Sequence, residues 1–218
     1  MSSANSREPA GRPVPRRPAM LDPTTFDSIA MERLDPAVIM TIAHETAAII
    51  VRTGRASNDP ALTQRLVGLV EEVGLSTLAE LWAGRPADSL PGTLWRLYVL
   101  REWVRRDPLG ASSDYRAGLP FADVAVVVAG VGSPPGPEEV RQVTDAILRG
   151  VFEADLADAL ERASAFCSVV AAGRASRDGQ DAIGTPASQS QASYAANVLR
   201  MGADLAAAAG LWRRGDLV

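Results

Sequence analysis

The chain has 218 residues, of which 47% are hydrophobic and 22% are charged, a balance typical of globular proteins. Only 5% are aromatic, so the core must come mainly from Ala, Val, Leu and Ile, which favours packed helices over a β-sandwich. The net charge of −4 combines +3 in residues 1–19 with −7 in residues 20–218, and this acidic body argues against a broad nucleic-acid-binding surface.

The first segment, residues 1–19, is rich in proline and arginine and has too few apolar residues for a core. We expect it to be disordered, with order beginning near Met20. It lacks the apolar stretch of a signal peptide, and we expect no segment to reach the roughly 20 apolar residues of a membrane span. The single cysteine, Cys167, cannot form an internal disulfide. Together these features predict a cytoplasmic protein.

Helix start and stop signals recur along the chain after this segment. An aspartate followed by a proline, as in Asp35-Pro36 and Asp59-Pro60, caps a helix whose first residue is the proline. Glycines stand where these helices are expected to end. With apolar residues at spacings of three and four, the signals predict helices at residues 36–52, 60–73, 77–83, 90–106, 108–117, 137–149 and 153–172.

The valine-rich residues 121–131 could form either a strand or a helix. No second strand candidate exists to pair with them, and an unpaired strand leaves its backbone groups without hydrogen bonds. We therefore expect a short helix that begins at Pro120. The glycines that follow resemble a dinucleotide-binding loop, but the neighbouring Pro134 and Pro135 lack the N–H groups that would hold phosphate. A turn between two helices is the expected structure.

Residues 174–191 are rich in Ser, Gly, Gln and Asp and show no hydrophobic periodicity, which predicts a flexible linker. A last amphipathic helix is expected at residues 192–214. We expect it to pack on the other helices, because an isolated alanine-rich helix is only marginally stable. The predicted fold is therefore all-α, with a single bundle of about seven to nine helices. The bundle domain covers residues 20–173, and the last helix packs against it.

Residues that could carry catalysis or bind a metal are sparse. His44 is the only histidine and belongs to no H-E-x-x-H or Glu-x-x-His pattern. Cys167 lies inside a predicted helix, and no G-x-S-x-G motif occurs. The acidic pair Glu71 and Glu72 is expected on a solvated helix face. The sequence thus indicates no catalytic site, metal site or cofactor, and it favours a non-enzymatic protein.

The densest group of aromatic and arginine side chains lies in residues 89–108. In the predicted helix at 90–106, Leu97, Leu100 and Val104 share one side with Trp103, and the arginines lie on the other. One interpretation is a central bundle helix whose arginine edge faces water. The other is a binding surface, because Trp, Tyr and Arg dominate interface hot spots. The residues expected to bind a protein partner are then Trp95, Tyr98, Arg101, Trp103 and Arg105.

Residues 74–98, GLSTLAELWAGRPADSLPGTLWRLY, are similar to the helix-turn-helix region of TetR-type repressors. In that family a glycine precedes a short helix, and a later G-T-L-Y opens the recognition region. The resemblance implies an alternative function, a DNA-binding regulator whose Thr93 and Arg96 contact DNA. Pro86 departs from the pattern, because a proline costs about 3 kcal/mol inside a helix.

Several segments also resemble a small all-helical family of uncharacterised proteins from high-GC Gram-positive bacteria. They are MLDPTTF at 20–26, MERLDPAVIM at 31–40, VRTGRASNDP at 51–60, SLPGTLWRLY at 89–98 and PPGPEEV at 134–140. Some members carry the label RNA polymerase subunit beta, although no polymerase motif occurs in this chain. The resemblance implies a transcription-associated accessory role with RNA polymerase as a candidate partner. An unrecognised enzyme is the third alternative.

Overall fold

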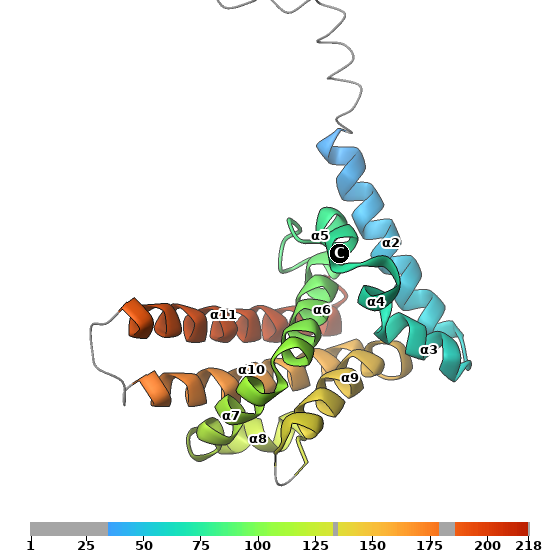
Figure 1. Cartoon of the computed structure of the whole chain (residues 1–218). Coiled ribbons are helices and arrows are strands. Elements are labelled where there is room, and N and C mark those ends of the chain that lie inside the picture. Colours follow the sequence, from blue (N-terminus) through green and yellow to red (C-terminus); the bar gives the residue numbers. More distant parts are fainter. Residues whose placement is uncertain (1–34, 133–134, 179–185, 218) are drawn as a thin grey trace, which may run out of the picture. The chain divides into compact units, whose positions relative to one another are not determined.

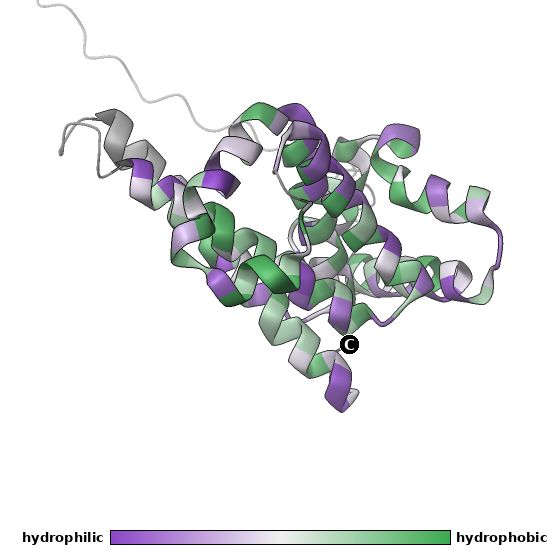
Figure 2. Cartoon of the chain, turned by 90° about the horizontal axis from the view of Figure 1, so that it is seen from below, coloured by the Kyte–Doolittle hydropathy of each residue, from purple (hydrophilic) through white to green (hydrophobic). Residues whose placement is uncertain are grey.

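The computed structural model describes residues 35–132, 135–178 and 186–217, and apart from Asp35 these belong to one compact unit, Pro36–Val218. Within these residues there are ten α-helices, one short 3-10 helix and no strand, so the all-α class is confirmed (Figure 1). Hydrophobic and hydrophilic residues are interspersed along the helices, as expected where each helix buries one face and exposes the other (Figure 2). The predicted disordered head, residues 1–19, lies outside the described residues.

Helix α2 (Pro36–Ala56) opens the unit and packs against α6 and α9. Its buried side consists of small residues, among them Ala43 and Ala47, which allow a close approach. By length and composition alone, α2 is also the one described helix that could cross a membrane. One segment therefore has the length and mean hydropathy of a membrane span, although Glu45, Arg52 and Arg55 interrupt its apolar residues and no apolar run reaches about 20.

A break at Gly68 divides the predicted helix 60–73 into α3 (Pro60–Val67) and α4 (Leu69–Val73). Asp59 caps α3 as expected, since its carboxylate accepts a hydrogen bond from the backbone N–H of Ala61 at 2.9 Å. Near the end of α3, the carbonyl of Leu66 accepts a hydrogen bond from the Tyr98 hydroxyl at 2.6 Å. In a continuous helix, the Leu66 carbonyl would accept a hydrogen bond from a backbone N–H of the next turn. Here the Tyr98 side chain, from another helix, takes the place of that N–H. The break raises the number of helices above the predicted seven to nine.

Helix α6 (Leu90–Arg106) lies at the centre of the unit and has the predicted bounds. It contacts α2, α5 (Leu75–Trp82), α7 (Pro108–Gly118), α9 (Pro137–Glu153) and α11 (Pro186–Arg214). Leu97, Leu100 and Val104, expected on its core side, are all buried. The position of α6 explains why its side chains meet so many other elements.

The valine-rich segment is helical, as expected. A 3-10 turn, η1 (Leu119–Phe121), contains Pro120, and α8 (Asp123–Ala129) follows it. Gly130 ends α8 with a φ of 71°, in the left-handed region that favours glycine.

Helices α7 and α10 (Leu156–Asp178) cross with their backbones in contact. A Cβ atom on Gly173 would collide with the carbonyl oxygen of Asp114, and one on Gly118 would collide with that of Val169. Any larger residue at these two glycines would therefore force the helices apart.

Helix α11 runs antiparallel along α10, so the last helix does pack on the others (Figure 1). Leu205, Ala208 and Ala209 are buried in this contact. The predicted linker 174–191 needs correction, because α10 continues to Asp178 and α11 begins at Pro186, while residues 179–185 lie outside the described residues. The extra turn of α10 is polar, and tertiary ion pairs hold it, as described below.

Candidate functional site

The first turn of α6 binds the loop that precedes it. The Ser89 hydroxyl accepts a hydrogen bond from the N–H of Gly92 at 3.3 Å and donates one to the carbonyl of Pro86 at 2.7 Å. The Thr93 hydroxyl donates to the carbonyl of Ala87 at 3.1 Å. A Cβ atom on Gly92 would collide with the Pro86 carbonyl oxygen. The sequence S-L-P-G-T therefore has a local structural role.

This arrangement differs from a helix-turn-helix, in which the N-terminal residues of the recognition helix contact base edges in the major groove. Residues 90–94 are all buried, including Thr93. Arg96 forms an ion pair with Asp204 of α11 at 2.9 Å. Neither predicted DNA-contacting residue is thus presented to a nucleic acid.

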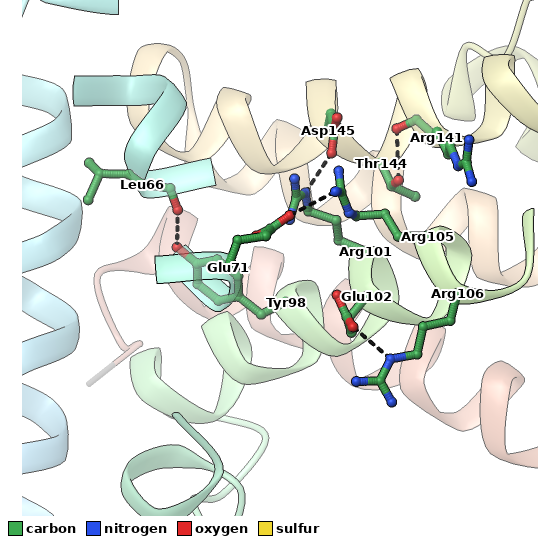
Figure 3. Close-up of polar contacts among 10 residues, drawn as sticks. All are labelled: Leu66, Glu71, Tyr98, Arg101, Glu102, Arg105, Arg106, Arg141, Thr144 and Asp145. Atoms are coloured by element: carbon green, nitrogen blue, oxygen red, sulfur yellow. Dashed lines mark hydrogen bonds and ion pairs between the residues drawn. The ribbon is translucent and has the colours of Figure 1, made fainter. Parts of the chain in front are cut away.

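Arg101 lies inside the molecule between α4 and α9 (Figure 3). Only 2% of its side chain is exposed. Its Nε donates to Asp145 at 2.5 Å, and its Nη1 lies 3.0 Å from both carboxylate oxygens of Glu71. Two carboxylates thus neutralise a buried cation. The expectation that Arg101 belongs to a solvated edge is wrong, and Glu71 binds arginine instead of lying on a free acidic face.

Tyr98 is fully buried, so it cannot contact a partner directly. Its ring packs against Trp82 with centroids 6.2 Å apart, and its hydroxyl donates to the Leu66 carbonyl (Figure 3). Desolvation raises the pKa of this hydroxyl. The interpretation of Tyr98 as a binding residue fails because a backbone carbonyl satisfies its polar end within the core.

Arg105 is the exposed arginine on this side of α6. It forms an ion pair with Glu71 at 3.1 Å and lines a pocket of about 330 Å³ together with Glu138, Arg141 and Asp145. Two cations and two carboxylates balance one another there. The pocket therefore has no preference for a ligand of either charge.

The opposite flank of α6 faces α11 across a cavity of about 240 Å³, which we call the α6–α11 cleft. Its walls come from the end of α5, from α6 and from α11. The lining residues are Ala83, Trp95, Arg96, Val99, Asn197, Arg200, Met201 and Asp204.

The polar residues of the cleft fall into two groups. Arg96 is held in place, since it forms an ion pair with Asp204 and donates to the Gly92 carbonyl at 2.9 Å. Arg200 and Asn197 are exposed, and their side chains make no hydrogen bond or ion pair with any residue that the structure describes. The cleft therefore keeps one positive charge, that of Arg200, without a partner.

Trp103 is half-buried and belongs to a chain of contacts that joins four helices. The centroid of its ring lies 6.0 Å from that of Tyr194 on α11. The Cζ atom of the Arg174 guanidinium lies over the Tyr194 ring, 4.1 Å from the ring centroid. Arg174 and Arg177 of α10 also form ion pairs with Asp114 of α7, at 2.8 and 3.1 Å. Desolvation raises the pKa of the buried Asp114 carboxyl, while both arginines act in the opposite direction.

The cleft contains side chains that sequence reasoning missed. Asn197, Arg200 and Asp204 recur at spacings of three and four, which places them on one side of α11. This periodicity is visible in the sequence, but only the packing of α11 on α6 brings these three side chains into the same cleft as Trp95. The α6–α11 cleft is thus lined by one residue predicted to bind a protein partner, Trp95, and by one predicted to bind DNA, Arg96.

A second exposed feature lies on α8 and the turn before it. Phe121 is 67% exposed, and Val124 and Val127 are each 80% exposed. The sequence predicts this helix but not that its valines face outward. Nothing in the described residues covers these side chains.

Within the residues that the structure describes, no group of three or more His, Cys, Asp and Glu side chains is arranged to hold a metal ion. His44 is half-buried on α2. Cys167 is fully buried, and desolvation raises the pKa of its thiol to about 12. A buried thiol of this kind is not activated as a nucleophile.

Comparisons of the chain with protein-family models, with curated proteins and with solved structures found no match.

Proposed function

We propose that this chain is a non-enzymatic cytoplasmic interaction or regulatory protein that binds a protein partner at the α6–α11 cleft. The observation that carries the proposal is the setting of Trp95, a half-buried indole in a cleft that also holds the unpaired Arg200. Tryptophan and arginine in partly enclosed pockets are the residue types that contribute most to binding between proteins.

The size of the cleft supports a protein partner. Pockets for small molecules typically measure about 300–1,000 Å³ and enclose most of the ligand. The α6–α11 cleft is smaller, at about 240 Å³. It suits a single anchoring side chain from a larger molecule.

The walls of the cleft are also ordered before binding. The Arg96–Asp204 ion pair spans it, and the contact between Trp103 and Tyr194 joins the same two helices nearby. A surface held in this way loses little conformational entropy when it binds, which favours affinity.

RNA polymerase is the partner to test first, on the strength of the sequence resemblance alone. The DNA-binding alternative has no observation in its favour, because Thr93 is buried and Arg96 is paired with Asp204. The unrecognised enzyme likewise has no supporting cluster of residues in the described part of the chain.

The proposal can be tested by affinity purification of the tagged chain from its native host, with nuclease treatment and quantitative mass spectrometry. Partners should be recovered with the wild type and be depleted about tenfold with Trp95→Ala and with Arg200→Glu. Arg116→Glu, the same charge reversal on an exposed arginine of α7, should change nothing. Equal recovery with all four proteins would contradict the proposal.

A further inference from the structure

We infer that the α6–α11 cleft selects an acidic segment of its protein partner, in which a carboxylate pairs with Arg200 while an adjacent apolar side chain covers Trp95. This inference rests on the proposed function and specifies the chemistry of the partner.

The charge of the cleft is the first argument. The cleft contains two arginines and one aspartate, and the Arg96–Asp204 pair cancels one charge of each sign. Arg200 remains as a net positive charge with no partner among the described residues. By contrast, the pocket around Arg105 contains equal numbers of cations and carboxylates. Of these two polar pockets, the α6–α11 cleft is the one that favours an anionic group.

The hydrogen-bonding groups point the same way. Arg200 offers up to five N–H donors in a planar fork, and the Asn197 amide and the Trp95 indole offer further donors. The one carboxylate of the cleft, on Asp204, is already bound by Arg96. Donors therefore exceed free acceptors, and a carboxylate is the side-chain group that supplies acceptors only and matches the guanidinium fork.

The apolar part of the cleft requires a second feature in the partner. Trp95 and Val99 lie one turn apart on α6, and Met201 faces them from α11 next to Arg200. A ligand that places a carboxylate on Arg200 therefore lies against apolar side chains as well. This fits a peptide in which Asp or Glu stands close to Leu, Met, Phe or Trp.

The inference can be tested by selecting a displayed library of random peptides on the full chain, on Arg200→Glu, on Trp95→Ala and on the control Arg116→Glu. The wild type and the control should enrich peptides that combine Asp or Glu with a large apolar residue. Arg200→Glu should enrich Lys or Arg in place of the acidic residues. Trp95→Ala should enrich neither class.

The outcomes separate the inference from the function on which it rests. Peptides that depend on Trp95 but show no acidic preference would overturn the inference and leave a protein-binding cleft in place. If no enriched peptide depends on Trp95, both the inference and the proposed function fail. Because Arg200 is exposed, its substitution tests the charge without disturbing the core.

A double-mutant cycle on the most enriched acidic peptide tests the direct contact. Arg200→Glu should weaken binding about tenfold, and replacement of the peptide's acidic residue by its amide should also weaken binding to the wild type. The amide peptide should show no further loss on Arg200→Glu, because the pair is already broken. Two independent, additive losses would show that the carboxylate binds elsewhere.

Discussion

At the scale of single residues, the arginines of α6 have different roles that follow from what each side chain meets. Arg101 is enclosed by Glu71 and Asp145, whereas Arg106 is largely exposed and pairs only with Glu102 of its own helix. A buried charge depends on its partners far more than an exposed one does. The same residue type therefore stabilises the fold at one position and contributes little at the other.

Arg101→Met should lower the free energy of unfolding by about 2–3 kcal/mol, because it leaves Asp145 without its cation and Glu71 with Arg105 alone. The loss stays below that of a fully buried pair, since Glu71 and Asp145 are partly exposed to water. Arg106→Met, the matched control, should change the same quantity by less than about 0.5 kcal/mol. Urea unfolding followed by circular dichroism measures both, and equal losses would contradict the assignment.

Asp114 should make stability depend on pH in a defined direction. Desolvation raises its pKa above the ordinary value of a carboxyl group, so the folded state holds the proton more tightly than the unfolded chain does. Its contribution is therefore most favourable below that value and declines as pH rises through the folded pKa. The charged and titratable groups around it are Arg174, Arg177, Asp107 and Tyr194.

Asp114→Asn removes this titration. The free energy of unfolding of the wild type, measured relative to the variant, should decline as pH increases from acid towards neutral. Urea unfolding of both proteins across that range gives the difference directly. A difference that increases with pH would show that the two arginines outweigh the desolvation of the carboxyl.

In α6, the burial of some side chains could be predicted from the sequence and the burial of others could not. Hydrophobic periodicity identified Leu97, Leu100 and Val104 as core, and all three are buried. It could not separate Trp95, which lines a cleft, from Tyr98, which is buried. Both lie on flanks of the helix, and the burial of a flank depends on which neighbouring helix packs there.

At the scale of elements, the starts of helices were more predictable than their ends. Asp59 and Ser89 cap α3 and α6 with side-chain hydrogen bonds that span two or three residues, so the signal is local. The break at Gly68 and the last turn of α10 depend on Tyr98 and on Asp114, which lie far away in the sequence. No local pattern carries that information.

The crossing of α7 and α10 gives a prediction for these two elements. Gly173→Ala should destabilise the protein by about 3 kcal/mol or more, because the new methyl group collides with the backbone of α7. Gly84→Ala, where no atom lies within 4 Å of the added group, should be neutral or slightly stabilising. Thermal unfolding of the two variants provides the comparison. Similar melting temperatures would show that the helices can separate without cost.

At the scale of the whole molecule, α11 completes the core. Leu205 and Ala209 are fully buried, and ion pairs from Arg96 to Asp204 and from Arg213 to Glu161 fasten the helix to α6 and α10. Removal of α11 would expose the side of α10 that faces it, where Cys167 and Ala171 are buried. An exposed surface of this kind promotes association.

A chain truncated after Asp178 should therefore lose cooperative unfolding and form oligomers. A chain that lacks only residues 1–19, which their composition predicts to lie outside the core, should keep the wild-type melting temperature. Calorimetry and size-exclusion chromatography with light scattering measure both effects. A monomeric, cooperatively folded truncation would show that α11 is dispensable for the bundle.

The all-α class, the start of most helices and the core side of α6 could all be predicted from local sequence patterns. These properties arise from capping and periodicity, which act within a few residues. The packing of helices against one another buries Tyr98 and Arg101 and brings Arg200 into the same cleft as Trp95. Those outcomes depend on contacts between distant segments, such as Arg96 and Asp204, 108 positions apart, which no local pattern encodes.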